Sequence, residues 1–247
     1  PMDVLGIGSN MVRSLRYWMQ AVGITKEPTH GKRTQQFTPL GELIYRYDRY
    51  IEEQGTLSLL QYELASNQEE ATAWYFFFNE FQMLEFTRDD FIRSLKNYVL
   101  MKDEETSVAD RSYQDDFSCI INTYIPRIKG GRLQFSPENN IACPLGELGL
   151  IDYVSQDRTI YRKTMVQPQM LSPYIALAMI LLQHGDNTEV SLESLLHASK
   201  SIGRAFNLDM TTLMQLLKQL EQLGEVEVVR TAGLDVVHIM TEYTAQE

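Results

Sequence analysis

The chain has 247 residues, of which 44% are hydrophobic and 22% charged, a composition that fits one large globular domain or two to three small ones and excludes disorder throughout. Its net charge of −11 argues against a protein that coats nucleic acid with its whole surface, and no apolar run approaches the ~20 residues that cross a bilayer. The first residues show no secretory signal, and Cys119 and Cys143 form no CxxC motif, so we expect a cytoplasmic protein with reduced thiols and no membrane partner.

The charge is distributed unevenly along the chain. Residues 1–37 carry a net charge of +3, residues 38–170 one of −8 and residues 171–247 one of −6. We predict a mainly α protein whose three parts coincide with these ranges. They are a helix-turn-helix-like element with a basic linker, a central helical domain with a short β-hairpin, and a winged-helix domain with small β-ribbons. Because the cations gather in the first part, any contact with phosphate is predicted near the N-terminus.

The first segment is predicted to form a tight turn followed by a helix. Gly6 and Gly8 permit the turn, and Ser9 or Asn10 can cap the helix by accepting its free backbone N–H groups. Gly23 is typical of the residue that follows a helix. Apolar residues at helical spacing are predicted to face the protein, and they are Val12, Leu15, Met19 and Val22, with Trp18 beside them.

The middle of the chain is predicted to be a series of helices. Aromatic residues are so dense over 71–81 that we expect a buried central helix there. Residues 152–166 have the pattern of a short hairpin. The other predicted helices cover residues 41–47, 56–65, 88–101 and 110–124.

The last third has the element order of a winged helix. Three helices are predicted, and two short β-rich runs follow them. The third helix would expose Gln215, Lys218, Gln219 and Gln222. Residues 191–240 hold four basic and six acidic side chains, which favours a packing or protein-contact module over a DNA-binding one. The predicted helices are 173–183, 191–206 and 211–223, and the β-rich runs are 225–230 and 234–240.

The N-terminal helix carries residue types that can read DNA. In a helix-turn-helix the second helix lies in the major groove, where Arg can bind guanine and Asn or Gln can bind adenine. We predict that Asn10, Arg13, Ser14, Tyr17 and Gln20 face outward, with Arg16 at the margin of this face. Arg13, Tyr17 and Gln20 would meet base edges, and Asn10 is a further candidate DNA contact. Phosphate is predicted to contact Arg16, Lys26, Lys32 and Arg33. The alternative is an ordinary amphipathic helix whose outer face is only solvated.

Signals for an enzyme are poor, so we predict no catalytic activity, no cofactor and no bound metal. The chain has no GxxxxGK[ST] motif, and Gly6-Ile7-Gly8 is an incomplete dinucleotide motif. The four histidines have no metal-binding spacing. The acidic pairs Asp89-Asp90 and Asp115-Asp116 fit solvated helix positions better than the ligands of a metal-dependent nuclease.

Several strings occur in the order found in one bacterial family. They are LGIGSNMVRSLRYWMQAVGI, YIEEQGTLSLLQYELASN, ATAWYFFFNEF, EFTRDDFIRSL, DDFSCIINTYI and CPLGELGLI. Over about residues 4–151 the chain therefore resembles the family numbered 4007 among the domains of unknown function. The resemblance implies an accessory protein of anti-phage or DNA-modification gene clusters, often encoded near sulfur-transfer proteins of DNA phosphorothioation, and it implies no catalytic residues.

Two departures from the family pattern stand out. Family members usually carry a further region before the LGIGSNMV string. The tryptophan and histidine of the family in the TLSLLQYEL stretch are replaced by Ser58 and Gln61, so a family role for that stretch does not transfer to this chain.

Residues and resemblance together predict a non-catalytic DNA-binding accessory protein of a bacterial DNA-modification or anti-phage defence system. Its expected partners are double-stranded DNA and the proteins of a modification complex. The acidic C-terminal half favours a protein-interaction scaffold as the alternative. A transcription repressor of its own gene cluster would need a dimer with reading helices about 34 Å apart. A metal-dependent nuclease using Asp115 is the least favoured alternative.

Overall fold

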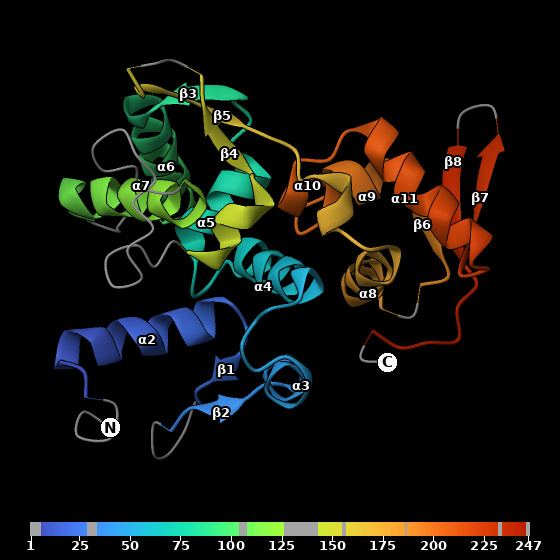
Figure 1. Ribbon diagram of the computed structural model, residues 1–247. Coiled ribbons are helices and arrows are strands. Elements are labelled where there is room, and N and C mark those ends of the chain that lie inside the picture. The colour runs from blue at the N-terminus through green and yellow to red at the C-terminus, as the bar shows by residue number, and fades with distance from the viewer. Residues whose placement is uncertain are drawn as a thin grey trace.

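The computed structural model describes residues 6–28, 34–103, 108–125, 143–154, 157–185, 187–231 and 234–245. Over these ranges the chain is mainly α, as predicted, and its antiparallel sheets are small (Figure 1). None of the helices within these ranges is long and apolar enough to cross a membrane. One hydrophobic cluster includes buried residues from Ala21 to Val237, so the three predicted parts contribute to a common core.

The first half of the chain consists of helices connected by short strands. The helices are α2 (Ser9–Ala21), α3 (Pro39–Tyr47), α4 (Gln54–Ser66), α5 (Thr72–Tyr75), α6 (Arg88–Lys102) and α7 (Asp110–Tyr124). The strands are β1 (Thr25–Lys26), β2 (Gln36–Phe37) and β3 (Glu85–Thr87). The sequence pattern indicated the helices but not these strands, which are too short to show an alternating pattern.

The second half begins with the predicted hairpin. Its strands β4 (Ile151–Tyr153) and β5 (Ile160–Lys163) pair antiparallel, and β3 adds to the other edge of β5 in the order β3-β5-β4. The remaining helices are α8 (Pro173–His184), α9 (Leu192–His197), α10 (Ile202–Phe206) and α11 (Met210–Gln222). The remaining strands are β6 (Glu189–Ser191), β7 (Val226–Thr231) and β8 (Leu234–Ile239), in the order β6-β8-β7.

The single helix predicted over 191–206 is two helices, α9 and α10. Lys200, between them, has a left-handed backbone with φ of 65°. An added Cβ at Gly203 would lie 2.3 Å from the carbonyl oxygen of Leu196, so only glycine allows α10 to approach α9 this closely. The apolar pattern continues across the break because both helices are buried, and it therefore did not reveal the break.

Helix α4 lies at the centre and connects the two halves of the chain (Figure 1). Its polar side chains Ser58 and Gln61 are fully buried. The Ser58 hydroxyl donates to the carbonyl oxygen of Met170 at 2.8 Å, and the Gln61 amide donates to that of Ala205 at 2.9 Å. The Tyr124 hydroxyl of α7 donates to the Gln61 Oε1 at 2.6 Å. These two departures from the family pattern are thus hydrogen-bonded core residues of this chain.

The predicted central helix begins as α5 and continues as a π-helical turn over Phe76–Glu80. The wider turn ends where the Phe81 N–H donates to the Phe76 carbonyl oxygen at 2.9 Å. The buried Asn79 donates to the carbonyl oxygens of Ala65 and Tyr75 and accepts the Lys200 backbone N–H at 2.6 Å. This asparagine therefore holds the aromatic turn against both α4 and the α9–α10 connection.

Two carbonyl oxygens at this turn accept hydrogen bonds from a buried lysine of the neighbouring sheet. The Lys163 amine donates to the carbonyl oxygens of Phe77 and Phe81, the second at 2.6 Å. Burial, and then the charge of Arg204, lowers the pKa of Lys163 to about 7. A neutral amine still has two N–H groups, which match the two carbonyl oxygens.

Replacing Lys163 with Met should lower the free energy of unfolding by about 1–3 kcal/mol, because the two buried carbonyl oxygens lose their donor. The parent should also become more stable as the pH rises from about 7 towards 10.5, since the unfolded chain holds the lysine proton over that range and the folded chain does not. Urea unfolding at several pH values measures both effects. An equal rise in the Met variant would show that Lys163 does not cause it.

Candidate nucleic-acid interface

Helix α2 is attached to the protein mainly at its C-terminal end. The Trp18 ring packs edge-on against the Trp74 ring of α5, with 5.3 Å between the ring centroids. The side-chain amide of Asn67 donates to the carbonyl oxygens of Gln20 and Ala21 at 3.4 and 3.3 Å. Ala21 is the buried residue of this helix, and its first two turns lie along the edge of the protein (Figure 1).

The predicted apolar stripe of α2 does not face inward along its whole length. Leu15 is 45% exposed, and Met11, one turn before it, is 61% exposed. Trp18, Met19 and Val22 pack against the core, as the spacing predicted. The expectation is wrong for Leu15 because the α2 residues that pack against the core begin at Trp18.

Of the eight predicted DNA-contacting residues, Asn10, Arg13 and Lys26 are clearly exposed. Within the described part of the chain, Arg13 forms no ion pair. Lys32 and Arg33 lie outside the described residues. The structure therefore offers Arg13 and Lys26 as cations that a phosphate or a base can reach.

Arg16 and Gln20 are engaged by the hairpin that follows the helix. The Arg16 guanidinium forms an ion pair with Glu27. The Gln35 amide donates to the Arg16 carbonyl oxygen at 3.0 Å and to the Gln20 Oε1 at 3.5 Å. Gln20 was expected to face outward, but the hairpin covers it in part. Arg16, expected at the margin as a phosphate contact, is paired with Glu27.

Tyr17 lies near the carboxylates of Asp116 and Glu70. It remains 37% exposed, and its ring contacts that of Trp18 edge-on at 5.7 Å. Burial raises the pKa of the Tyr17 hydroxyl to about 12, with smaller contributions from Asp116, Cys119 and Glu70. The negative charges of Asp116 and Glu70 disfavour an approaching phosphate on this side of the helix.

A second exposed polar face lies on α11. Gln215, Lys218, Gln219 and Gln222 are exposed there, as predicted. Lys218 and Arg230 of β7 line the same shallow groove, together with Gln215 and Glu221. Of the acidic residues in this region, Glu225 is buried and Asp209 accepts the Thr212 N–H as the N-cap of α11. The Glu221 carboxylate accepts the Val228 N–H at 3.1 Å and lines the groove beside the two cations, so the groove carries both signs of charge.

The acidic pairs show no metal-binding cluster. Within the described ranges, no group of three His, Cys, Asp or Glu side chains is placed to hold a metal ion. Asp90 belongs to the capping box of α6, where the Thr87 N–H donates to it at 3.1 Å. Asp115 lies 3.8 Å from Arg111, and burial together with the Asp115 charge raises the pKa of Asp116. The structural role expected for Asp90 agrees with these contacts.

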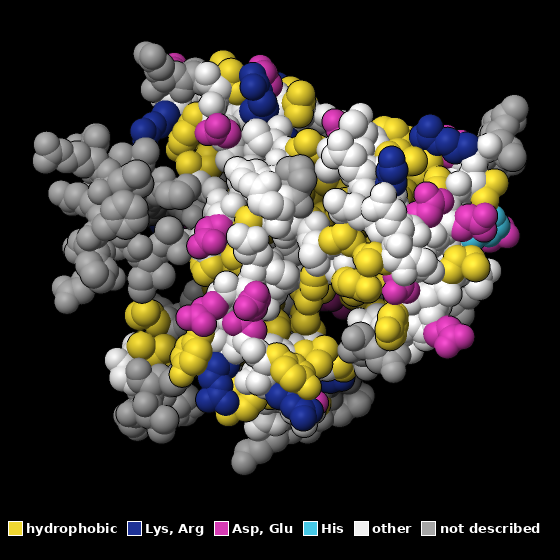
Figure 2. Space-filling model, turned by 45° about the vertical axis from the view of Figure 1, so that its right-hand side comes forward, with side chains coloured by type: hydrophobic (Ala, Val, Ile, Leu, Met, Phe, Trp, Pro, Cys, Tyr) yellow, Lys and Arg dark blue, Asp and Glu magenta, His cyan; other side chains and the backbone are white. Residues whose placement is uncertain are grey.

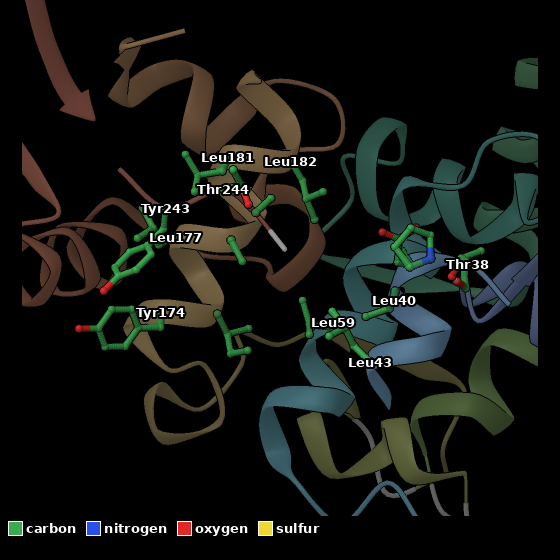
Figure 3. Close-up of a pocket in the computed structure, with 16 residues that line it drawn as sticks. Thr38, Leu40, Leu43, Leu59, Tyr174, Leu177, Leu181, Leu182, Tyr243 and Thr244 are labelled. Atoms are coloured by element: carbon green, nitrogen blue, oxygen red, sulfur yellow. The ribbon is translucent and has the colours of Figure 1, made fainter. Parts of the chain in front are cut away.

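An apolar groove lies between α8 and the segment that contains α3 and α4 (Figure 3). Its cavity volume is about 650 Å³, within the range of ligand and peptide sites. Leu40, Leu43 and Leu59 line one side, and Leu177, Leu181 and Tyr174 line the other. The residues come from distant parts of the sequence, so no local motif could have indicated this groove.

Glu63 of α4 is the carboxylate in the lining of the groove. An added Cβ at Gly23 would lie 2.9 Å from its side chain, so the glycine after α2 makes room for it. Burial raises the pKa of Glu63, and the charge of Lys200 offsets this only in part. The groove thus combines an apolar surface with one partly buried acidic group.

Comparisons with known proteins identify the family of this chain. The family model described as a protein of unknown function (DUF4007) matches residues 1–247, and the chain belongs to this family. The match extends the resemblance seen in the sequence into the C-terminal third. A comparison with curated proteins finds no match.

Two similar crystal structures carry the name SspB. A magnesium ion-bound SspB structure has 27% sequence identity and a TM-score of 0.82 to this chain, and a second SspB structure has 25% identity and a TM-score of 0.81. Each similarity covers 97% of this chain and 73% of the SspB chain. This chain therefore has an overall fold similar to that part of SspB.

Replacing Glu63 with Gln should raise the free energy of unfolding at pH 7, because the buried carboxylate is desolvated and the amide is not charged. Because the pKa of Glu63 is raised in the folded chain, the desolvation penalty is present at pH values above that pKa. The penalty disappears as the pH falls below 4.5, where the carboxyl is protonated in both the folded and the unfolded chain. Thermal unfolding at pH 7 and at low pH measures the difference, which should close on acidification. A difference that does not depend on pH would contradict this assignment.

Proposed function

We propose that this protein is a non-catalytic, DNA-binding accessory protein of a bacterial DNA-modification or phage-defence system. The observation that carries the proposal is the exposed end of α2, where Arg13 is unpaired within the described residues and Asn10 lies one turn before it. Lys26 adds a second exposed cation on the adjoining strand. The chain belongs to the DUF4007 family and is similar in fold to SspB, and both findings support the proposal that it shares a role with these proteins.

The same contacts limit how α2 can meet DNA. Asn10 and Arg13 can approach base edges, and Lys26 can approach phosphate. Arg16 can join them only if its ion pair with Glu27 opens, and Tyr17 contributes mainly through its packing. DNA contact is thus proposed to involve the first two turns of the helix rather than its whole outer face.

We also propose that residues 173–239 act as a winged-helix module. The order α8, β6, α9–α10, α11, β7 and β8 supports this, with α11 in the place of the recognition helix and β7–β8 as the wing. Lys218 and Arg230 flank one groove of this module and are suited to phosphate contacts. In this proposal α2 and α11 are two separate contacts with one duplex.

The double variant Arg13→Ala, Arg16→Ala should bind a short labelled DNA duplex at least about tenfold more weakly than the parent at low salt. The slope of log K against log salt should also become shallower, by about 0.9 for each arginine whose contact with phosphate is lost. Glu27→Gln should act in the opposite direction and strengthen binding, because it frees the Arg16 guanidinium and removes a negative charge. Fluorescence anisotropy over a salt series measures all three proteins.

The matched control is Arg93→Ala, Arg162→Ala, which removes two ion-paired arginines of α6 and β5. It makes the same change in net charge away from α2 and should bind as the parent does. Equal affinity of the parent and the Arg13, Arg16 variant would contradict the assignment. A parent without affinity for duplex DNA that co-purifies with a modification enzyme would favour the protein-interaction scaffold, with the groove beside Glu63 as the contact surface.

A magnesium-dependent nuclease is the alternative that the magnesium ion-bound SspB structure favours. Mg²⁺ often takes only one or two carboxylates from a protein and completes its shell with waters and substrate phosphates. Asp115 and Asp116 are adjacent carboxylates that could act in this way, and a divalent cation would relieve the repulsion that raises the pKa of Asp116.

The nuclease alternative predicts nicking of supercoiled plasmid by the purified protein in the presence of Mg²⁺, with loss of nicking in Asp115→Ala. The control is Asp110→Ala, which removes an exposed carboxylate of the same helix that pairs with Lys96. Absence of nicking by the parent, or equal nicking by all three proteins, would reject this alternative and leave the accessory role.

A further inference from the structure

The apolar groove between α8 and the α3–α4 segment has exposed hydrophobic side chains among its lining residues. Leu43 of α3 is 39% exposed and Leu182 of α8 is 50% exposed. Tyr174 and Tyr243 are 52% and 56% exposed. In the space-filling view, hydrophobic side chains gather around a hollow above the level of α3 (Figure 2). Exposed apolar side chains gathered around an apolar hollow are typical of a surface that a partner covers.

Among the described residues that line this groove, Glu63 is the only one with a charged side chain. The residue is half-buried, and within the described part of the chain no hydrogen bond or ion pair engages its carboxylate. Lys200 acts on it only through its charge, which offsets the effect of burial in part. A carboxylate removed from water without a partner is destabilising. A cation that enters the groove would supply the missing partner.

The charge of the lining decides which chemical class of partner fits. A phosphate or a lipid carboxylate would be repelled by Glu63, and no Lys or Arg of the described lining would attract it. A partner that combines apolar groups with one cation matches both the leucines and the carboxylate. Charge complementarity of this kind gives a contact its specificity.

The walls of the groove decide the form of the partner. Helices α3, α4 and α8 supply most of the described lining. Addition of a partner strand needs an exposed sheet edge, and helix walls offer none, since their backbone groups are bonded within the helices. An amphipathic helix instead places the apolar side chains of one face into a groove of this kind. Such a helix also contacts the exposed Leu43 and Leu182, which a small molecule held inside the hollow would leave uncovered.

We propose that the groove formed by α3, α4 and α8 binds an amphipathic helix of a partner protein, and that a lysine or arginine in the apolar face of that helix pairs with Glu63. Apolar side chains of the helix fill the space between Leu59 and Leu177, which lie on opposite walls (Figure 3). This inference names a protein contact for the accessory role proposed above, and it uses none of the residues proposed to contact DNA.

The first test selects binders of the full chain from a displayed library of helical peptides. The library fixes leucine at positions i, i+3 and i+7 and randomises one position within the apolar face. Peptides recovered with the parent should carry Lys or Arg at that position, and a parallel selection with Glu63→Gln should lose this preference. Because Glu63→Gln is expected to be at least as stable as the parent, the loss cannot result from unfolding.

The second test titrates a selected lysine peptide, and the same peptide with methionine in place of that lysine, by fluorescence anisotropy. The parent should bind the lysine peptide about tenfold or more tightly than the methionine peptide, and Glu63→Gln should not distinguish them. Leu43→Glu, Leu182→Glu should weaken binding of both peptides about tenfold or more, because it removes apolar contacts at exposed positions. The matched control is Leu84→Glu, Leu100→Glu, which changes two exposed leucines outside the groove and should bind as the parent does.

Failure to recover peptides whose binding depends on Leu43 and Leu182 would overturn the proposal, and so would recovered peptides without a preference for a cation. Thermal unfolding with n-hexylamine tests a small amine as the occupant. A rise in Tm that Glu63→Gln abolishes, in a protein that binds no peptide, would replace the helical partner by a small amine.

The Arg13, Arg16 variant separates this proposal from the one for α2. That variant should lose affinity for duplex DNA and keep affinity for the lysine peptide, whereas the Leu43, Leu182 variant should do the reverse. A parent that binds the peptide and no DNA would contradict only the DNA contacts. Loss of peptide binding in the Arg13, Arg16 variant would overturn the assignment of the helix to this groove.

Discussion

The structure depends on the burial of α4, a helix that contacts both halves of the chain. A buried polar side chain is destabilising unless it is hydrogen-bonded. Gln61 meets this condition by donating to Ala205 and accepting from Tyr124, and Ser58 meets it by donating to Met170. These bonds require the last third of the chain to pack in one position. Asn79 and Lys163 impose the same constraint on the aromatic turn beside α4.

The surfaces suited to binding lie at the periphery, outside the packed centre. Helix α2 is anchored by Trp18 and Ala21 and projects Arg13 from an otherwise anionic protein. The short helix α3 is anchored by Gly41 and Ile44 and exposes its tyrosines. Where α8 meets the α3–α4 segment, the two packed surfaces do not close completely, and the groove beside Glu63 remains. Each of these surfaces lies outside the buried contacts that hold the core together.

The candidate interface was only partly predictable from the sequence. Exposure of Asn10, Arg13 and Lys26 followed from helical spacing and local charge. The pairing of Arg16 with Glu27 did not, because it depends on where the chain returns after α2. The exposed tyrosines at the end of α3 are close together in the sequence (YRYDRY, residues 45–50), although such a pattern does not reveal which rings are buried. The groove had no local signal, since its walls are more than one hundred residues apart in the chain.

The sequence by itself determined the mainly α class, most helix positions and the family, because hydrophobic periodicity and capping residues act over a few neighbouring positions. It also located the cationic end of an anionic chain. Tertiary structure alone decided that α9 and α10 are separate, that Leu15 is exposed and that Lys163 is buried. Each of these outcomes depends on how closely two distant segments approach, and that distance is set by packing and hydrogen bonding across the core rather than by local preference.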